Sequence, residues 1–284
     1  MNTFTDKKID LTITLGTGTF GESIGDTFAL SNLRIYADLS ASCGESMGAL
    51  QLRVFGLTQS MMSQLTRIGL IGQAKPRNTV LLSAGDSTAM YTIFEGTIYE
   101  AWADYNAAPE VVFNIIAYVG MDLALKPVNA TSIQGTADVG DIMKAFASSA
   151  GLAFNNFGVN TKLSNPYFPG TLWTQIKQCA LAAGINYEIG FGALSIWPQN
   201  GNTSTGNIPV ISPQTGMVGY PSLSSQGITI RSVFNQNIKQ GGLVQIESSI
   251  ITGTFNVFKL QHSLSSQAPG GPFFTIFDCT PQIS

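Results

Sequence analysis

The chain has few charged residues. Asp, Glu, Lys and Arg make up 11% of its 284 residues, while 44% are hydrophobic. Ordinary soluble domains have about 25% charged residues. The 14 basic and 17 acidic residues give a net charge of −3 without a lysine or arginine run, so a surface that neutralises nucleic-acid phosphates is not expected. Because solitary proteins rarely expose large uncharged patches, the composition indicates a surface covered largely by partner subunits.

Histidine and paired cysteines are also scarce. Cys43, Cys179 and Cys279 are far apart in the sequence, and His262 is the only histidine. These four residues could in principle bind zinc, but structural zinc sites take ligands in closely spaced pairs. We predict instead that the cysteines are small buried hydrophobic residues and that His262 is a hydrogen-bonded packing residue. No disulfide framework, metal or other cofactor is expected.

No segment resembles a signal peptide or a membrane span. Residues 1–10 mix both charge signs and lead into no apolar stretch. The longest apolar stretch, residues 111–125, is interrupted by Asn114 and Asp122. It is also shorter than the roughly 20 residues that a spanning helix requires. We therefore expect a soluble chain without membrane insertion.

The first half of the chain has the pattern of short β-strands. Apolar and polar residues alternate in three segments, which predicts half-buried strands: residues 11–15, 33–38 and 50–55. A hairpin is predicted over residues 78–99, with a bulge at Gly96, and a strand covered on both faces over residues 111–119. One short helix is predicted over residues 61–68, ending at Gly69.

The middle of the chain has helical patterns. Asp138 is placed to cap a helix that ends at Gly151, and a strand follows at residues 152–154. A second helix ends at Gly184, and residues 185–197 form a hairpin pattern. The sequence thus predicts a helix, strand, helix and hairpin, which together make a small α/β module.

The last third returns to strand patterns, at residues 228–233, 243–251, 255–262 and 273–279. No helical pattern occurs there. The predicted fold class is mainly β with an α/β insertion. The expected division is an N-terminal β-barrel-like domain, an α/β module and a C-terminal β domain: residues 1–127, 128–206 and 207–284.

A glycine-rich segment, residues 16–21, matches the G-x-G-x-x-G pattern after a predicted strand. A dinucleotide site also requires a helix N-terminus directly after the glycines, which holds the pyrophosphate. Residues 22–26 are a poor helix and lead into further strand. A kinase would need H-R-D and D-F-G elements, which the sequence lacks. We predict a glycine-rich turn between strands.

A second segment, residues 44–48, matches the G-x-S-x-G nucleophile elbow of hydrolases. Ser46 precedes His262, as in the chain order of α/β-hydrolases. The elbow, however, is a sharp turn from a strand into a helix, whereas an alternating strand follows Gly48. A loop between strands is the favoured interpretation, and a serine hydrolase remains the enzymatic alternative.

Acidic pairs could serve a glycosidase, which needs two carboxyl groups at a fixed separation. Glu100 with Asp104, and Asp104 with Glu110, are such pairs. Since 17 scattered acids yield neighbours by chance, solvated loop charges are the favoured interpretation. Three aromatic residues nearby are equally suited to anchor an interface: Tyr99, Trp102 and Tyr105.

Several segments of the chain resemble baseplate hub proteins of tailed bacteriophages. The similarity covers most of the chain and lies in turns and strands without a reaction signature. It involves residues 163–170 with the following helix, 194–198, 211–221, 255–262 and Gly270-Gly271, together with residues 16–21 and 50–56.

This resemblance implies a structural subunit and not an enzyme. Such subunits form a trimeric ring, in which two barrel-like β domains of tail-tube type in each chain flank the α/β module. The ring would join the tail tube to the central spike, contact neighbouring baseplate proteins, and let DNA pass without specific binding. The expected location is the virion tail baseplate, after assembly in the host cytoplasm.

We expect interface residues among the aromatic and loop residues that look exposed: Tyr99, Trp102, Tyr105, Tyr167, Phe168, Met217 and Tyr220. No catalytic residue is assigned. Two alternatives stay open, a tail-associated hydrolase using Ser46 or a wall-glycosidase acid pair, and a receptor- or glycan-binding tail module.

Overall fold

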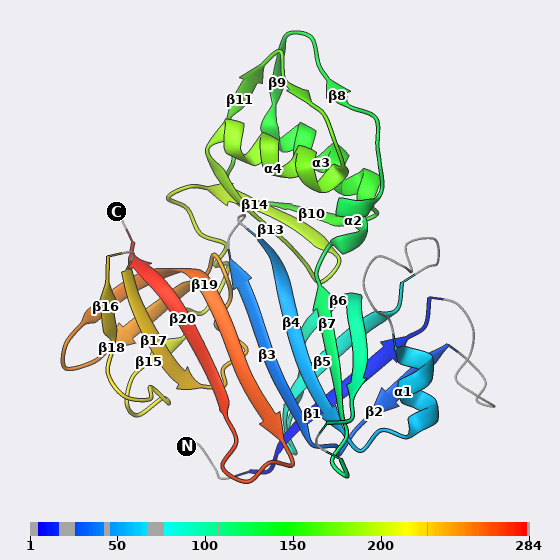
Figure 1. Cartoon of the computed structure of the whole chain (residues 1–284). Helices are drawn as coiled ribbons and strands as arrows, with labels where there is room; N and C mark the ends of the chain where they lie inside the picture. Colours follow the sequence, from blue (N-terminus) through cyan, green and yellow to red (C-terminus); the bar gives the residue numbers. More distant parts are fainter. Residues whose placement is uncertain are drawn as a thin grey trace.

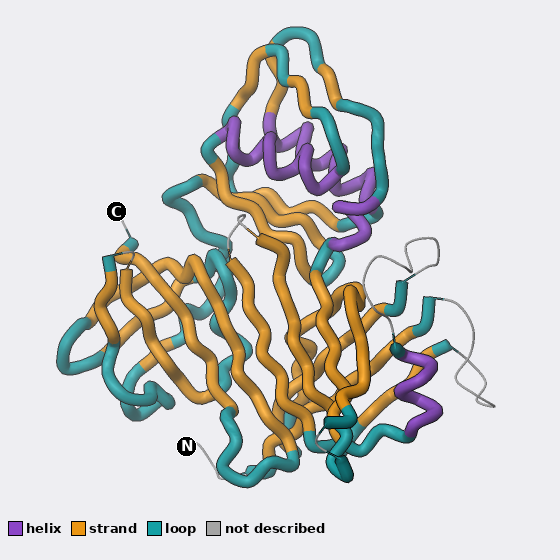
Figure 2. Tube along the Cα trace, in the orientation of Figure 1, coloured by secondary structure: helices purple, strands orange, loops and turns teal. Residues whose placement is uncertain are grey.

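The computed structural model describes residues 5–16, 26–42, 46–66, 77–106, 108–225 and 227–282. The protein is mainly β, as predicted (Figure 1). Strands fill its N-terminal and C-terminal parts, and an α/β module stands over one end of the main sheet (Figure 2).

The elements follow the predicted order of β, α/β and β segments. The N-terminal part has β1 (Lys7–Thr14), β2 (Thr27–Leu30), β3 (Ile35–Ser42), β4 (Ser46–Phe55), α1 (Gln59–Leu65), β5 (Thr79–Asp86), β6 (Met90–Asp104), β7 (Val112–Tyr118) and α2 (Met121–Leu125). The module has β8 (Thr131–Ser132), β9 (Thr136–Asp138), α3 (Val139–Ala150), β10 (Ala153–Asn156), β11 (Lys162–Ser164), β12 (Tyr167–Phe168), α4 (Leu172–Ala183), β13 (Ile185–Gly190) and β14 (Ala193–Pro198). The C-terminal part has β15 (Val210–Ile211), β16 (Ser222–Ser224), β17 (Gly227–Val233), β18 (Leu243–Glu247), β19 (Thr252–Ser266) and β20 (Phe273–Pro281).

One 13-stranded sheet joins the N-terminal and C-terminal parts. Its order is β16-β17-β20-β19-β3-β4-β7-β6-β5-β1-β2, with β18 also paired to β19 and β15 to β18. The N-terminal strands curl back, so that Lys7 Nζ on β1 lies 5.9 Å from the centroid of the Phe273 ring on β20. No ladder joins β1 to β19 within the described ranges, and the strands close no barrel there.

The long strand β19 connects the two parts by changing partner along one edge. Its first residues pair with β18, and residues Lys259 to Ser266 pair with β3. Its other edge pairs with β20 along most of its length, with a register shift between Val257 and Lys259. An extra residue in one strand bends it and increases its twist, so the change of partner coincides with a bend.

The hydrophobic core has three clusters that follow the three parts of the chain. The first lies inside the curled N-terminal sheet, the second between the helices and the small sheet of the module, and the third among the C-terminal strands. Strand alternation produces these cores: Ile9, Leu11 and Ile13 of β1 are at most 1% exposed, while the residues between them are half-buried.

The two module helices begin and end as predicted. Asp138 caps α3 by accepting a hydrogen bond from the Gly140 N–H at 2.8 Å, and Gly151 ends the helix at φ 69°. Thr171 caps α4, and Gly184 ends it at φ 62°. Glycine takes this left-handed conformation without the steric cost of a Cβ, which explains both helix ends.

Two local predictions about the N-terminal strands were wrong. The bulges of β6 lie opposite Leu82/Ser83 and between Ile98 and Glu100, whereas Gly96 pairs regularly with Val80. A Cβ on Gly96 would meet the Phe94 ring at 2.7 Å, so glycine permits a close approach there. The outer face of β7 is half-buried and not fully covered. The short helix α1 ends at Leu65, where Thr66 takes an extended conformation, so its predicted end at Gly69 was also wrong.

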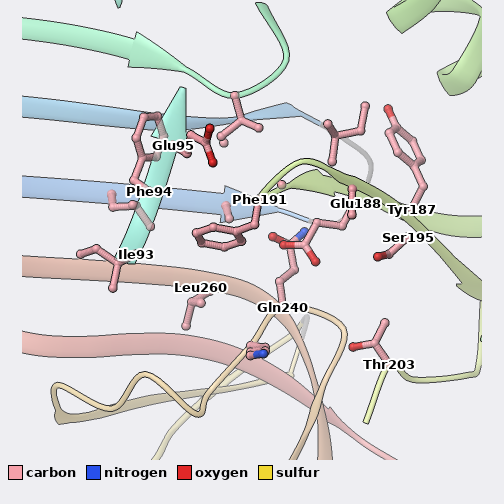
Figure 3. A pocket seen from close by; sticks show the side chains of 18 of the residues that line it. Ile93, Phe94, Glu95, Tyr187, Glu188, Phe191, Ser195, Thr203, Gln240 and Leu260 are labelled. Atoms are coloured by element: carbon pink, nitrogen blue, oxygen red, sulfur yellow. The ribbon is translucent and has the colours of Figure 1, made fainter. Parts of the chain in front are cut away.

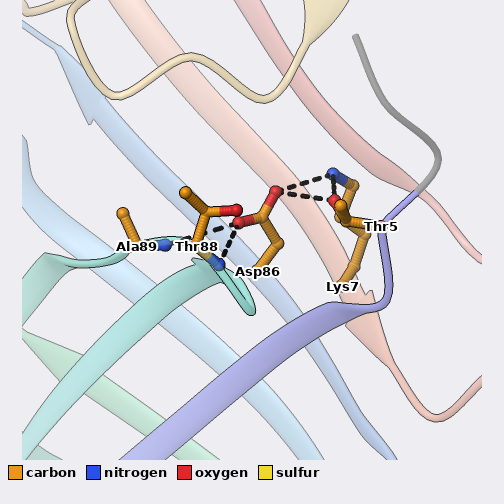
Figure 4. A network of polar contacts seen from close by, with 5 residues as sticks. All are labelled: Thr5, Lys7, Asp86, Thr88 and Ala89. Carbon is orange, nitrogen blue, oxygen red and sulfur yellow. Dashed lines mark hydrogen bonds and ion pairs between the residues drawn. The ribbon is translucent and has the colours of Figure 1, made fainter.

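A polar network fixes the turn between β5 and β6 to the N-terminal strand (Figure 4). The Asp86 carboxylate accepts hydrogen bonds from Thr5 Oγ1 at 2.7 Å and from the Thr88 N–H at 2.9 Å. The Ala89 N–H and Lys7 Nζ lie at 3.4 and 3.5 Å. These donors favour the charged form and hold the pKa of Asp86 well below its usual range, with the Thr5 hydroxyl contributing most.

Asp86→Asn is expected to weaken this turn, because the neutral amide loses charge-assisted hydrogen bonds. The pKa of Asp86 is lower in the folded than in the unfolded protein, so its contribution is present above pH 4 and is lost as the pH falls further. Urea denaturation should give a lower midpoint for the variant at pH 7, and the difference from wild type should shrink below pH 4. A constant difference across this range would contradict the assignment.

Candidate functional site

The glycine-rich segment at residues 16–21 lies almost wholly outside the described residues. Its first glycine follows β1, and the Gly16 N–H donates to Asn78 Oδ1 at 3.1 Å. This bond fixes Gly16 to the start of β5. The prediction of a glycine-rich turn at residues 17–21 therefore stays a prediction.

Ser46 does not lie on a nucleophile elbow. It is the first residue of β4 and lies opposite Ser42 of β3, and β4 continues as strand to Phe55. The helix that would aim backbone N–H groups at an oxyanion is absent from this described segment. The strand predicted after Gly48 is confirmed, whereas Ser46 itself lies in β4 and not in the predicted loop.

His262 is a packing residue on β19, as predicted. It is 4% exposed, its Nδ1 lies 3.0 Å from Thr275 Oγ1, and its ring packs edge-on against Phe234. A catalytic triad places a carboxylate at Nδ1, whereas here a hydroxyl takes that position. Burial lowers the pKa of His262 to about 4, which keeps the ring neutral near pH 7.

The cysteines lie in different cores. Cys179 is buried on α4 in the module, and Cys279 is buried on β20 in the C-terminal cluster. Burial raises the pKa of both thiols to about 12, so neither is a thiolate near neutral pH. No three possible metal ligands gather within the described ranges. Cys43 lies outside them.

The first acidic pair, Glu100 with Asp104, is too far apart for a glycosidase site, and both members of the second pair have local partners. Glu100 and Asp104 lie four residues apart on β6, about 13 Å along a strand, and glycosidases need about 5 to 9.5 Å. Asp104 Oδ1 accepts from the Asn106 N–H and side-chain amide at 2.9 and 2.7 Å. Glu110 pairs with Arg34 Nη2 at 2.8 Å. Asp104 and Glu110 thus stabilise the local structure through these bonds.

Three of the selected interface residues are exposed. The exposed fractions are 53% for Tyr105, 62% for Tyr167 and 74% for Tyr220. Tyr99 and Trp102 on β6 are half-buried. These five residues remain the predicted interface residues.

Phe168 and Met217 are buried, so the expectation that they are exposed was wrong. Phe168 is 5% exposed and packs edge-on against Phe146 in the module core. It follows Tyr167 on β12, and successive strand residues point to opposite faces. Met217 is 9% exposed and pairs with Ser232, which places it in the C-terminal core.

A cavity of about 560 Å³ lies where the three parts of the chain meet. Its walls come from β3, β4, β6, the β13–β14 hairpin, β19, and the loops at residues 203–205 and 236–240 (Figure 3). Ligand sites commonly have volumes of about 300 to 1,000 Å³ and lie at domain interfaces. This cavity is therefore the candidate functional site in the described part of the chain.

The cavity combines apolar walls with polar groups that lack partners. Gln240 is 4% exposed, its side chain points into the cavity (Figure 3), and it forms no hydrogen bond to the described residues. The Glu188 carboxylate likewise has no hydrogen bond or ion pair there. Burial raises the pKa of Glu188 to about 7, opposed by the charge of Lys239.

An aromatic side chain occupies the tip of the β13–β14 hairpin at this cavity. Phe191 lies at φ 48°, an unusual conformation for a large side chain, and is 60% exposed. Sequence reasoning found the hairpin but missed the cavity. Its lining residues come from segments far apart in the chain, and no local pattern shows that these segments meet.

Comparison with known proteins identifies the family. A family model described as baseplate hub gp41 matches residues 11–279. The chain belongs to this baseplate hub family. The family is structural, in agreement with the resemblance noted in the turns and strands of the sequence, and its match spans all three parts of the fold.

Two solved structures with a similar fold are tail proteins. The 43 kDa tail protein of prophage MuSo2 from Shewanella oneidensis has a TM-score of 0.63 at 9% identity, covering 98% of both chains. A tail protein of Neisseria meningitidis MC58 has a TM-score of 0.62 at 9% identity, covering 95% of this chain and 96% of that one.

A secretion-system protein shares the fold as well. The E. coli c3393 protein, described as a type VI secretion component with structural similarity to the T4 tail proteins gp27 and gp5, has a TM-score of 0.61 at 9% identity. The similarity covers 89% of this chain and 74% of that protein. No curated protein matched the chain. No helix in the described part is long and apolar enough to cross a membrane.

Glu188 and His262 should give stability opposite dependences on pH. The pKa of Glu188 is raised on folding, so its contribution is full below its unfolded pKa and is lost as the pH rises through 7. The pKa of His262 is lowered, so its contribution is full above its unfolded pKa of 6.5 and is lost as the pH falls toward 4. In the wild type these two changes should partly cancel.

Single substitutions should expose each dependence. In Glu188→Gln the free energy of unfolding should rise by up to about 3 kcal/mol from pH 4.5 to 7, through His262 alone. In His262→Asn it should fall over the same range, by about 2 kcal/mol because Glu188 is only half-buried. Urea titrations at several pH values measure both slopes. Two variants with the wild-type profile would contradict the assignments.

Proposed function

We propose that this baseplate hub protein is a subunit of a homotrimeric ring that joins the tail tube to the central spike. The observation that carries the proposal is an exposed, uncharged end of the main sheet. Tyr220 is 74% exposed and Leu223 of β16 is 68% exposed, and β16 is the end strand. Large exposed apolar side chains on an end strand are a liability unless another protein covers them.

The sequence around this end strand has no protective charge. Residues 220–225 contain no Asp, Glu, Lys or Arg, and Ser222–Ser224 are all exposed. Natural proteins usually protect end strands with lysine, other charges or a covering segment. The absence of such protection in a chain with 11% charged residues supports an obligate subunit interface at this surface.

The two ends of the sheet differ, which supports a ring. The other end strand is β2, whose sequence and exposure differ from those of β16. An interface between different surfaces joins subunits head to tail, and such contacts close into rings when the rotation permits. Two curled β regions in each of three chains would then present six similar units to a tail tube.

Weak attraction for DNA supports a role as a channel. The net charge of −3 and the absence of a basic run provide no surface that would hold the phosphates of passing DNA. In the proposed function the ring holds the spike until contact with the host, and DNA then leaves through it. The protein is assembled in the host cytoplasm and resides in the virion baseplate.

We expect the purified protein to form trimers of three 30.2 kDa chains. Mass photometry at submicromolar concentration and analytical ultracentrifugation at micromolar concentration measure the oligomeric state. Tyr220→Ser with Leu223→Ser should weaken self-association by at least tenfold, because it removes the exposed apolar anchors. Tyr167→Ser with Leu181→Ser, on the exposed surface of the module, is the matched control and should leave it unchanged.

A strictly monomeric wild type at micromolar concentration would overturn the ring. Equal effects of the two double variants would instead show that β16 is not the interface. Electron microscopy of particles completes the test, since the chain should lie between tube and spike. A position elsewhere in the tail would contradict the proposed location.

We expect no serine hydrolase activity. A fluorophosphonate probe should leave Ser46 unlabelled, because it lies at the start of a strand without an elbow helix. Ser46→Ala is the matched control, and a known serine hydrolase in the same reaction verifies the probe. Labelling that disappears in Ser46→Ala would establish the enzymatic alternative.

A further inference from the structure

The α/β module contacts the main sheet tightly on one side and loosely on the other. Near the end of β7, Gly120 lies under the Trp173 ring of α4, where an added Cβ would come within 3.2 Å. Toward the C-terminal part lies the cavity of about 560 Å³. Two connections attach the module, residues 126–130 and 199–209. Hinges are a few loop residues that absorb a change in backbone angles, and these two connections are loops of that kind.

Two groups of opposite charge line this hollow side without forming an ion pair. Glu188 belongs to β13 of the module, and Lys239 belongs to the loop between β17 and β18 of the C-terminal part. They are close enough for the Lys239 charge to act on Glu188, yet too far apart for contact. Lys239 is exposed, and its side chain is free to move.

Gln240, next to Lys239 in the sequence, is a third polar residue at the cavity without a side-chain hydrogen bond to the described residues. The Gln240 side chain is buried, lines the cavity and forms no hydrogen bond to the described residues. Glu188, on the facing hairpin, offers an acceptor for this amide as well as for the Lys239 ammonium.

We propose that the module closes onto the C-terminal part by bringing the Glu188 carboxylate onto Lys239 and Gln240, and that the loss or gain of a proton on Glu188 selects the closed or the open position. The open position is the one described above, with the hollow side unfilled. Closure shrinks the cavity, removes Phe191 from solvent and gives all three polar groups partners. This movement of the module depends on the geometry of the cavity and not on the proposed homotrimeric ring.

The other titratable groups at the cavity leave Glu188 as the group that changes charge near neutral pH. Burial lowers the pKa of His262 on β19 to about 4 and raises the pKa of Tyr187 on β13 to about 12, so both are neutral. Glu95 on β6 is exposed. The pKa of Glu188 is about 7 in the open position, and an ion pair with Lys239 would lower it in the closed one, so closure becomes more favourable as the pH rises toward 7.

The distance between module and C-terminal part tests this device. Spin labels on cysteines replacing Leu181 of α4 and Ile250 before β19, which are 81% and 55% exposed, report that distance by pulsed electron resonance. Cys179 and Cys279 are buried and are left in place, and Cys43 is replaced by serine. Labelled chains are diluted with unlabelled ones, so that only distances within one chain are measured.

We expect the mean distance to shift between pH 5 and pH 9 with a midpoint at or below 7, because the pKa of Glu188 in the open position marks the upper end of the transition. Glu188→Gln, which is isosteric and neutral, should keep the low-pH distance throughout, and so should Lys239→Met, a change at an exposed side chain. Glu95→Gln is the matched control and should keep the pH response. A thermal melt of each variant verifies that it is folded.

Two results would overturn the proposal. One is a distance distribution in the wild type that does not change from pH 5 to pH 9. The other is a shift of unchanged size and midpoint in Glu188→Gln, which would assign the response to another group. Since neither result depends on oligomeric state, failure of the device is distinguishable from failure of the proposed ring.

Discussion

The pairing of β19 with two different strands along one edge holds the fold together. Backbone N–H and C=O groups buried in a sheet must be paired, and β19 meets this requirement with β18 in its first part and with β3 in its second. The register shift between Val257 and Lys259 lies at the change of partner. Because of this one strand, the N-terminal and C-terminal β regions share a sheet while each keeps its own core.

The shared sheet also determines where the candidate site lies. The module leaves the sheet after β7 and the chain returns at β15, so the β13–β14 hairpin stands over the ends of β3 and β4 and beside the loop before β18. The three hydrophobic cores meet at this point, and the side chains of none of them fill the space between the parts. The cavity therefore results from the way the parts are joined, and its polar groups, Glu188 and Gln240, lie on different parts.

Membership of the baseplate hub family accounts for several features of this architecture. Low charge, an exposed end strand and an open sheet are unfavourable in an isolated molecule, yet they suit a subunit that other chains cover. Residue type alone, however, does not predict which aromatic residues are exposed. Tyr167 and Phe168 are adjacent aromatic residues with the same apparent character, but strand alternation exposes the first and buries the second.

The sequence by itself determined much of the local structure, including the strand alternation of β1, β3 and β4, the Asp138 cap of α3 and the glycine ends at Gly151 and Gly184. These features depend on residues within a few positions of one another. Only the tertiary structure decided that β19 changes partners and that Glu188 faces Lys239 across a cavity. Such arrangements bring together residues about 50 or more than 200 positions apart, and no local periodicity specifies which distant segments meet.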